Sequence, residues 1–399
     1  MDDATLERLA ELIVVVGANV QPGQIVGIST EPGKERLTRA VAASAYRHGA
    51  KFVDPFTFDV HVKRARIEHA PADTLDFVPE WYGGRLKALA RERGARIGLG
   101  GPTAPGLLDD LDPERVGRDR LPWLKEILEL INDRTTNWTA APCPTPGWAE
   151  LVHPELEPAA ALARLSDEVA HVCRLDEADP IEAWRQRLNA LGAVAERLSE
   201  RRFDSLHFAG PGTDLTIGLL PSGRWATARF RTVDGIPHLA NVPTEEVFTS
   251  PDPERTEGSV RSTKPLVLND GTVIRGLEVR FEGGRAVSVN ADSRADVMRG
   301  RLATDAGAPR LGEVALVDRE GRIGKLGTIF YDTLLDENAA SHIAFGDGFG
   351  FVLGESDAER RNRSAIHIDF MIGGDDVDVT GLTRDGERVP VLRGGDWQI

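Results

Sequence analysis

The sequence predicts an α/β protein in which an N-terminal domain with a parallel sheet precedes a larger, β-rich α+β domain. Three observations support this fold class. The first hundred residues alternate between helical and strand-like hydrophobic spacing, which is typical of a parallel sheet. From residue 203 onward, short runs rich in Val, Ile, Leu and Phe are separated by glycine-containing turns, which is typical of antiparallel strands. The length of 399 residues is enough for two or three domains.

The N-terminal α/β domain is expected to span residues 1–105. Its hydrophobic spacing predicts a helix over 3–18, a strand over 24–29, a helix over 34–48, a strand over 51–58, and a helix, a turn and a strand within 83–101. The segment GPTAPG (101–106) is rich in Gly and Pro, which is typical of a domain boundary.

The remaining residues, 106–399, are expected to form the catalytic domain. Residues 113–200 are predicted to be mostly helical, because 121–132 and 179–200 have helical spacing. Three prolines within five residues exclude a helix inside the intervening segment NWTAAPCPTPGWA. The part over 203–399 is predicted to be β-rich, with hairpin turns at 269–271 (Asn-Asp-Gly) and 384–386 (Arg-Asp-Gly).

Composition and charge exclude several classes of protein. The formal net charge of −15 argues against a nucleic-acid backbone or an anionic membrane as the main partner. The only cysteines, Cys143 and Cys173, exclude a disulfide scaffold and suit a reducing compartment. The N-terminus is acidic and then amphipathic, so no signal peptide is expected, and no apolar run approaches the length of a membrane span. We therefore expect a cytoplasmic protein.

The strand predicted within SAIHIDFMIGG (364–374) has an unusual composition. Because side chains alternate along a strand, Ile366, Ile368 and Phe370 would share one face and His367 and Asp369 the other. An imidazole and a carboxylate on one strand face are candidate metal ligands.

Three further segments interrupt the apolar pattern with groups of the same chemistry. Glu245 and Glu246 precede an apolar strand, and Glu313 stands alone ahead of another. His342 is expected a few residues after a helix start at 336–338. Two imidazoles and three carboxylates suit Zn, Co, Mn or Mg, and a bridging carboxylate is the usual way to build a site for two ions. In contrast, the sequence lacks a phosphate-binding loop and a Gly-x-Ser-x-Gly elbow.

Five segments, taken in order, resemble the M29 family of metalloaminopeptidases, the thermophilic aminopeptidase group. They are HFAGPGTDLTIGL, NVPTEEVFTSPD, GAPRLGEVALV, FYDTLLDENAASHIAFG and IHIDFMIG. The resemblance covers nearly the whole chain, more weakly in the N-terminal domain. It implies a two-domain cytoplasmic enzyme, usually a homodimer, that removes N-terminal residues from peptides with a free N-terminus by using two divalent ions.

Matched motif by motif, the resemblance implies five metal ligands: Glu246, Glu313, His342, His367 and Asp369. Glu313 would be the ligand that bridges the two ions. Glu245 is a candidate proton-transfer group, because it adjoins Glu246.

One position departs from the family pattern. The family usually has a tyrosine seven residues beyond the histidine of the ENAxxH motif, where this chain has Phe349. A tyrosine hydroxyl there could donate a hydrogen bond during catalysis, and the loss of one such donor typically costs on the order of a hundredfold in rate.

Two alternatives to an aminopeptidase remain open at this point. His342, His367 and Asp369 could form the two-histidine, one-carboxylate site of a mononuclear Fe(II) ring-cleaving dioxygenase on the same scaffold. Such a site has no need of Glu246 and Glu313, whose presence favours the peptidase. Phe349 is the one feature that favours an inactive homologue.

Overall fold

The structure is a computed structural model that describes residues 1–119, 121–122, 124–268 and 271–399. The chain forms two compact units. The first unit contains residues 1–185 and 228–244 with a short link at 271–272, and the second contains 186–227, 245–268 and 273–399. Every helix within the described ranges is too short or too polar to span a membrane.

The first unit is built on a four-stranded parallel sheet with the strand order β2-β1-β3-β4. These strands are β1 (Ile25–Thr30), β2 (Phe52–Thr57), β3 (Ala95–Gly100) and β4 (Asn137–Pro142). The helices are α1 (Asp3–Leu12), α2 (Glu35–Arg47), α3 (Val60–His69), α4 (Glu80–Arg91), α5 (Pro113–Arg118), α6 (Lys125–Asp133), α7 (Pro146–Val152) and α8 (Pro158–Val172). The π-helical turn η1 (Ile13–Gly17) continues α1, and a small hairpin joins β7 (Arg229–Arg231) to β8 (Pro237–Leu239).

The predicted alternation of helix and strand is confirmed, and the proline-rich segment that interrupts the helical pattern supplies a further strand. β4 ends at Pro142, and it pairs in parallel with β3 although it lies beyond residues 101–106. Proline favours extended backbone in the residue before it, which suits a strand end. Pro146 then begins α7, so the expectation of no helix within 137–149 is wrong for the last four residues, because proline is tolerated in the first turn of a helix. The hydroxyl of Thr145 accepts a hydrogen bond from the backbone N–H of Trp148.

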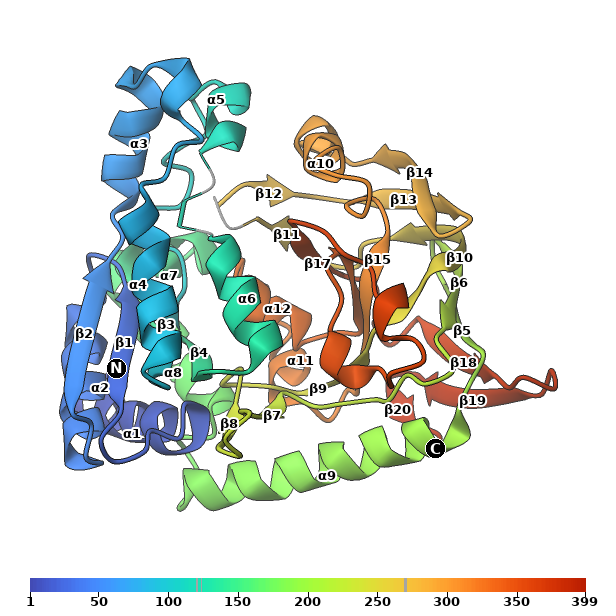
Figure 1. Ribbon diagram of the computed structural model, residues 1–399, viewed down its shortest axis with the longest axis horizontal. Coiled ribbons are helices and arrows are strands. Elements are labelled where there is room, and N and C mark those ends of the chain that lie inside the picture. Colours follow the sequence, from blue (N-terminus) through green and yellow to red (C-terminus); the bar gives the residue numbers. More distant parts are fainter. Residues whose placement is uncertain (120, 123, 269–270) are drawn as a thin grey trace. The chain divides into compact units, whose positions relative to one another are not determined.

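The second unit contains a large antiparallel sheet and a smaller one. The large sheet has the order β14-β13-β10-β6-β5-β18-β19-β20. Its strands are β5 (Ser205–Gly210), β6 (Thr213–Leu219), β10 (Pro251–Arg261), β13 (Glu278–Glu282), β14 (Arg285–Asn290), β18 (Asp378–Leu382), β19 (Arg388–Arg393) and β20 (Asp396–Trp397). The smaller sheet has the order β17-β16-β15-β9 and is formed by β9 (Glu246–Thr249), β15 (Leu311–Val317), β16 (His342–Gly346) and β17 (His367–Met371) (Figure 1).

Helices and short strands complete the second unit. They are α9 (Pro180–Arg201), which contains the boundary between the units, α10 (Ala295–Leu302), α11 (Arg322–Leu326), α12 (Thr333–Glu337), β11 (Leu266–Val267) and β12 (Val273–Ile274). Apolar side chains of both sheets form one hydrophobic core. Within it, the ring of Phe345 stacks on Phe370 at 5.2 Å and on Phe281 at 5.7 Å, measured between ring centroids.

The β-rich character of the second unit and one of its predicted hairpins are confirmed. β18 and β19 pair antiparallel across the turn at 384–386. β11 and β12 also pair antiparallel, but Asn269 and Asp270 of the other predicted turn lie outside the described residues.

The predicted helix start at 336–338 is wrong. α12 ends there, at Glu337, and begins after Asp332, whose carboxylate accepts a hydrogen bond from the N–H of Leu335. An Asp followed by a short polar segment is compatible with either end of a helix, and the earlier Asp332 takes the N-cap position.

His238 predicts a pH dependence of stability in the first unit. Its side chain in β8 is buried beside Trp138 and Phe230, and neither ring nitrogen has a hydrogen-bond partner among the described residues. Burial lowers the pKa of His238 to about 4. Below its ordinary pKa near 6.5 the unfolded chain binds a proton that the folded chain excludes, so stability falls as the pH drops from about 6.5 to about 4.

Replacing His238 with Phe should remove the fall in stability that the protonation of this histidine causes. We expect the melting temperature at pH 5 to rise relative to the parent protein, and the difference to vanish by pH 8. The exposed His61 provides a control, because His61→Phe should leave the pH profile of stability unchanged. Parallel profiles for His238→Phe and the parent protein would contradict a neutral, buried His238.

Candidate metal centre

The register of the smaller sheet brings the five predicted ligands to one face. Glu313 on β15 lies opposite Ala344 on β16, which lies opposite Asp369 on β17. His342 pairs with Ala315. Ala315 lies two residues after Glu313 on β15, and His342 lies two residues before Ala344 on β16. Residues opposite each other, and residues two apart along a strand, share a face of the sheet.

The same rule places the remaining ligands. Glu246 lies opposite Val317, four residues after Glu313, and His367 lies opposite Gly346, four residues after His342. Residues in alternate positions, such as Val314, Ile343 and Phe370, belong to the hydrophobic core on the other face. The alternation within IHIDF thus separates metal-type ligands from the core.

Small residues occupy the middle of the ligand-bearing face. Ala315 and Ala344 are fully buried, and each lies between strands that carry ligands. Gly346 has a φ of +95°, and a Cβ there would come within 2.1 Å of the carbonyl oxygen of Ile366. Short side chains leave the space above the sheet to the longer carboxylates and imidazoles around them.

The ligand atoms form three overlapping groups. Within each group, one ligand atom from every residue lies within 4.8 Å of the others. The groups are Glu246, Glu313 and His342; Glu313, His367 and Asp369; and Glu337, His342 and Asp369. Among the described residues, Glu313 is the single member common to the first two groups.

Glu337 is the member of these groups that sequence reasoning missed. It is the last residue of α12 and lies five positions before His342, inside the same motif, DENAASH. An acidic residue that close to a candidate histidine is a usable signal, but the segment was expected to be the first turn of a helix. Because α12 ends at Glu337, this residue lies close to His342 and Asp369.

Backbone carbonyls orient both histidines. The Nδ1 atoms of His342 and His367 lie 3.2 Å from the carbonyl oxygen of Ala340 and 2.8 Å from that of Asp347. The Nε2 atoms face carboxylates, with His342 3.1 Å from Glu246, and His367 3.1 Å from Glu313. A histidine that donates through Nδ1 offers Nε2 to a metal, which is the usual arrangement of a histidine ligand.

The charges in the cluster perturb one another strongly. Burial raises the pKa of Glu313, and burial together with the charges of Asp369 and Glu246 raises the pKa of Glu337 well above its ordinary value. Burial would lower the pKa of His342, but its hydrogen bond to Glu246 and the neighbouring negative charges raise it to about 10. Without a cation, this cluster holds an excess of negative charge in a buried place.

Glu245 lies outside the three ligand groups and belongs to a separate buried network. Its fully buried carboxylate accepts a hydrogen bond from the guanidinium of Arg187 on α9. Arg187 also donates to Asp318 at 3.0 Å, immediately after β15. Burial alone would lower the pKa of Arg187, but Glu245 and Asp318 raise it, so the guanidinium stays charged.

Phe349 lies beside the ligand cluster. The centroid of its ring is 5.3 Å from that of His367, and the side chain is partly exposed. The position matched to the family's tyrosine is therefore adjacent to a predicted ligand, with a phenyl ring in place of a phenol.

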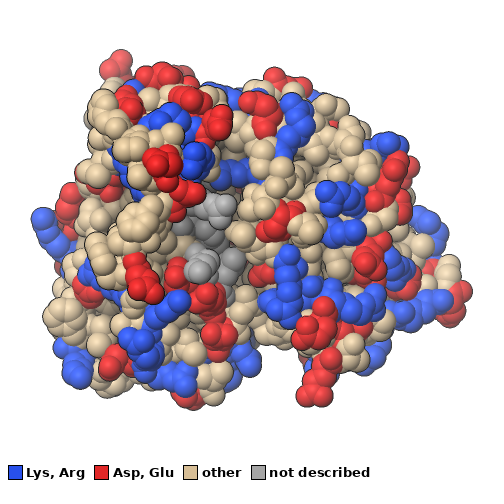
Figure 2. Space-filling view, turned by 45° about the horizontal axis from the view of Figure 1, so that its top comes forward, with Lys and Arg blue, Asp and Glu red and all other residues tan. Residues whose placement is uncertain are grey.

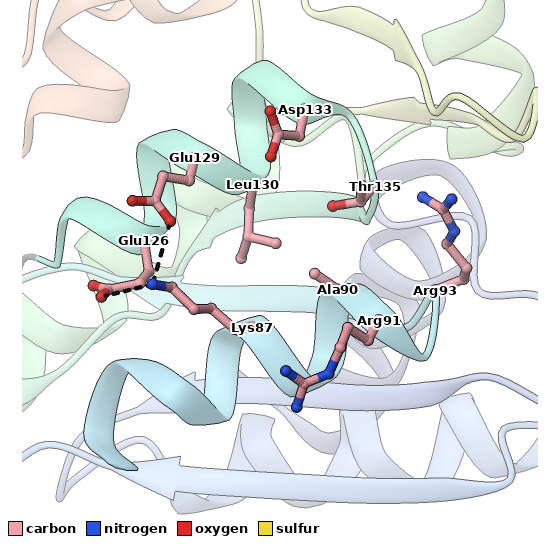
Figure 3. Close-up of a pocket in the computed structure, with 9 residues that line it drawn as sticks. All are labelled: Lys87, Ala90, Arg91, Arg93, Glu126, Glu129, Leu130, Asp133 and Thr135. Carbon is pink, nitrogen blue, oxygen red and sulfur yellow. Dashed lines mark ion pairs between the residues drawn. The ribbon is translucent and has the colours of Figure 1, made fainter. Parts of the chain in front are cut away.

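A pocket in the first unit offers a different kind of site. A cavity of about 440 Å³ lies between α4 and α6, which pack side by side (Figure 3). Lys87 contributes a positive charge on one side, and Glu126 and Glu129 on the other side each lie 3.7 Å from its ammonium group. The charge of Lys87 is paired across the pocket, and the metal-ligand groups found among the described residues all lie elsewhere.

The face of the molecule seen in Figure 2 does not resemble a nucleic-acid interface. On the face seen in Figure 2, acidic and basic side chains are interspersed, whereas a surface that binds a phosphate backbone is usually a basic patch.

Comparisons with known proteins agree with the predicted resemblance. The family model of the thermophilic metalloproteases (M29) matches residues 2–397. Aminopeptidase T of Thermus thermophilus is 44% identical over 99% of this chain and 98% of its own length. The solved structure of wild-type AmpT from Thermus thermophilus matches with a TM-score of 0.91 and 42% identity, over 99% of both chains.

A more distant structural match bears on the predicted alternative. The 2,5-dihydroxypyridine dioxygenase of Pseudomonas putida KT2440 is 12% identical, with a TM-score of 0.50 over 100% of this chain and 98% of its own. That likeness concerns the fold alone. The match to the M29 model and the close relatives cover nearly all of the chain, which therefore belongs to the M29 family of thermophilic metalloproteases.

Proposed function

We propose that the chain is a metal-dependent aminopeptidase whose smaller sheet and α12 hold two divalent ions. The observation that carries this proposal is the overlap of the three ligand groups, which together contain four carboxylates and two imidazoles. Four carboxylates balance the charge of two divalent cations when both imidazoles bind as neutral ligands. Oxygen and imidazole donors without thiolates suit Zn, Co, Mn or Mg.

Glu313 is our choice for the bridging ligand. It belongs both to the group with Glu246 and His342 and to the group with His367 and Asp369. Glu337 shares His342 with the first of these groups and Asp369 with the second. Two ions held by these residues would supply an activated water molecule and polarise the scissile carbonyl.

Glu245 has a supporting role in this proposal. Its carboxylate is paired with Arg187, and its backbone N–H donates to the side-chain oxygen of Asn338 at 2.7 Å. Asn338 follows Glu337, and Glu245 precedes Glu246, so this hydrogen bond joins two segments that carry ligands. Outer-shell contacts of this kind fix the orientation of metal ligands.

The substrate class follows from the chemistry of the cluster and from the names of the relatives. We propose peptides with a free N-terminus, because a carboxylate-rich site attracts an α-ammonium group. Acetylation of that group should abolish turnover. We expect hydrolysis of leucyl-p-nitroanilide and no detectable hydrolysis of its N-acetyl derivative, whereas efficient cleavage of an N-acetylated peptide at an internal bond would contradict an exopeptidase.

The number of ions can be measured directly. After treatment with EDTA and reloading with zinc or cobalt, the protein should contain about two ions per chain by elemental analysis. EDTA should abolish hydrolysis, and reloading should restore it. A single tightly held iron per chain, with no gain from zinc or cobalt, would favour the dioxygenase.

The grouping of the histidines favours the aminopeptidase over that rival. A two-histidine, one-carboxylate iron site needs both histidines on one ion. Across the described part of the chain, no ligand group contains both His342 and His367. An inactive homologue is supported by Phe349 alone, and metal-dependent turnover of an aminoacyl anilide would exclude it.

Two further properties are proposed from the resemblance. A cytoplasmic location is consistent with Cys143 and Cys173, which are both buried and unpaired. The expected assembly is a homodimer, which light scattering of the purified protein would test.

A further inference from the structure

Three phenylalanines form a cluster at the metal centre. Phe248 lies two residues after Glu246 on β9 and therefore shares its face of the sheet. The ring centroid of Phe349 is 5.2 Å from that of Phe248 and 5.4 Å from that of Phe351. We call Phe248, Phe349 and Phe351 the phenylalanine cluster.

The contacts of Phe349 place this cluster over the ligand-bearing face. Phe248 and His367 belong to β9 and β17, the two edge strands of the smaller sheet, and the ring of Phe349 lies within about 5 Å of both, centroid to centroid. The ring of Phe349 therefore lies between side chains of the two edge strands, beside the predicted ligand His367. The backbone fixes it there, because the N–H of Phe349 donates to the hydroxyl of Ser250 at 2.7 Å.

Burial distinguishes the members of the cluster. Phe248 is only 2% exposed and lies beneath the others, whereas Phe349 and Phe351 are partly exposed. A nearby cation, Arg361, lies 3.9 Å from Asp347 and donates to the carbonyl oxygen of Gly348, so its charge has partners. Phe349 and Phe351 thus present partly exposed aromatic surface beside the ligand cluster.

We propose that Phe349 and Phe351 form the wall that receives the side chain of the substrate's N-terminal residue. This inference rests on the proposed function, in which the first carbonyl of the peptide would lie at the ions, and on the position of Phe349 beside the predicted ligand His367. A leucine, methionine or phenylalanine side chain buries apolar surface against these rings, whereas a charged side chain loses hydration without gaining a partner. Peptides with an apolar N-terminal residue are the preferred substrates.

The test compares p-nitroanilides of Phe, Leu, Ala, Lys and Glu on the metal-loaded full-length protein. We expect kcat/KM for Leu and Phe to exceed that for Lys and Glu by at least about tenfold. Phe351→Ala should lower the ratio of kcat/KM for Phe over Ala by about tenfold. Phe77→Ala is the matched control, because Phe77 is 66% exposed in the first unit, and it should leave that ratio unchanged.

A second variant keeps the test informative if Phe351→Ala does not fold. Phe351→Asp should raise the ratio of kcat/KM for Lys over Leu by about tenfold or more, because it places a carboxylate at the wall. An unchanged ratio in folded variants, or a preference of the parent protein for Lys or Glu, would overturn the inference while leaving the aminopeptidase intact. Absence of turnover with every anilide would instead overturn the proposed function, and the inference with it.

Discussion

Replacing Glu313 with Gln is expected to lower kcat/KM by well over a hundredfold and to reduce the metal content of the protein. Outer-shell partners of metal ligands already contribute about 10- to 100-fold, so a ligand shared by two ions should cost more. Gln keeps the size of Glu313 but removes the charge and one of the two strong donor oxygens. Elemental analysis and steady-state kinetics on the same preparation would check both effects.

The same substitution should have the opposite effect on stability without metal. Burial raises the pKa of Glu313, which means that its ionised form destabilises the metal-free fold. In EDTA at pH 8 we therefore expect Glu313→Gln to melt at a higher temperature than the parent protein. Residues that a functional site requires often lower the stability of the fold.

Glu245→Gln is the matched control for this prediction. It removes a charge from the residue beside Glu246, but there the charge is paired with Arg187. Breaking one partner of a buried ion pair typically costs roughly 3–5 kcal/mol, so this variant should melt at a lower temperature and keep more activity than Glu313→Gln. Equal, small losses of activity from both substitutions would show that Glu313 does not bridge the ions.

Replacing Ala344 with Val is expected to have the second large effect. Ala344 is fully buried, and it lies between Glu313 on one neighbouring strand and Asp369 on the other. Two added methyl groups would enter the space that the ligand side chains surround. A displacement of about 1 Å in a catalytic group can cost on the order of a hundredfold in rate, and we expect a loss of at least that size together with weaker metal binding.

The control for Ala344→Val is Ala344→Ser, which adds a single small atom. Serine should retain most of the metal and most of the activity. Melting temperatures in EDTA separate a damaged fold from a filled site, because overpacking alone lowers stability by about 1–3 kcal/mol. Full activity and two ions in Ala344→Val would show that the ions do not lie above this part of the sheet.

Local sequence patterns were sufficient for the broad architecture. The alternation of helix and strand in the first hundred residues corresponds to β1, β2 and β3 with their helices. The hydrophobic spacing did not predict β4. Prolines that exclude a helix are equally compatible with the end of an extended strand. Only the pairing of β4 with β3, about 40 residues earlier in the chain, makes that segment part of the sheet.

Five of the six residues in the ligand groups could be proposed from the sequence, because an imidazole or a carboxylate stands out within an apolar strand. For His367 and Asp369, the alternation along one strand already implied a shared face, since the period of a strand is a local property. Glu337 stands at the end of a helix, where an acidic residue is ordinary, and only its closeness to His342 in the sequence marks it as a candidate.

The sequence by itself determined the residue types available for a metal site and the strand faces that His367 and Asp369 would share. The tertiary structure decided which of these groups meet, because the register between strands depends on packing between segments 21 to 71 residues apart in the chain. It also decided that Glu337 joins them, that Glu245 pairs with Arg187, and that Ala315 and Ala344 lie between the ligands. Each of these outcomes depends on contacts between distant segments, and such contacts leave no periodic trace in a single strand or helix.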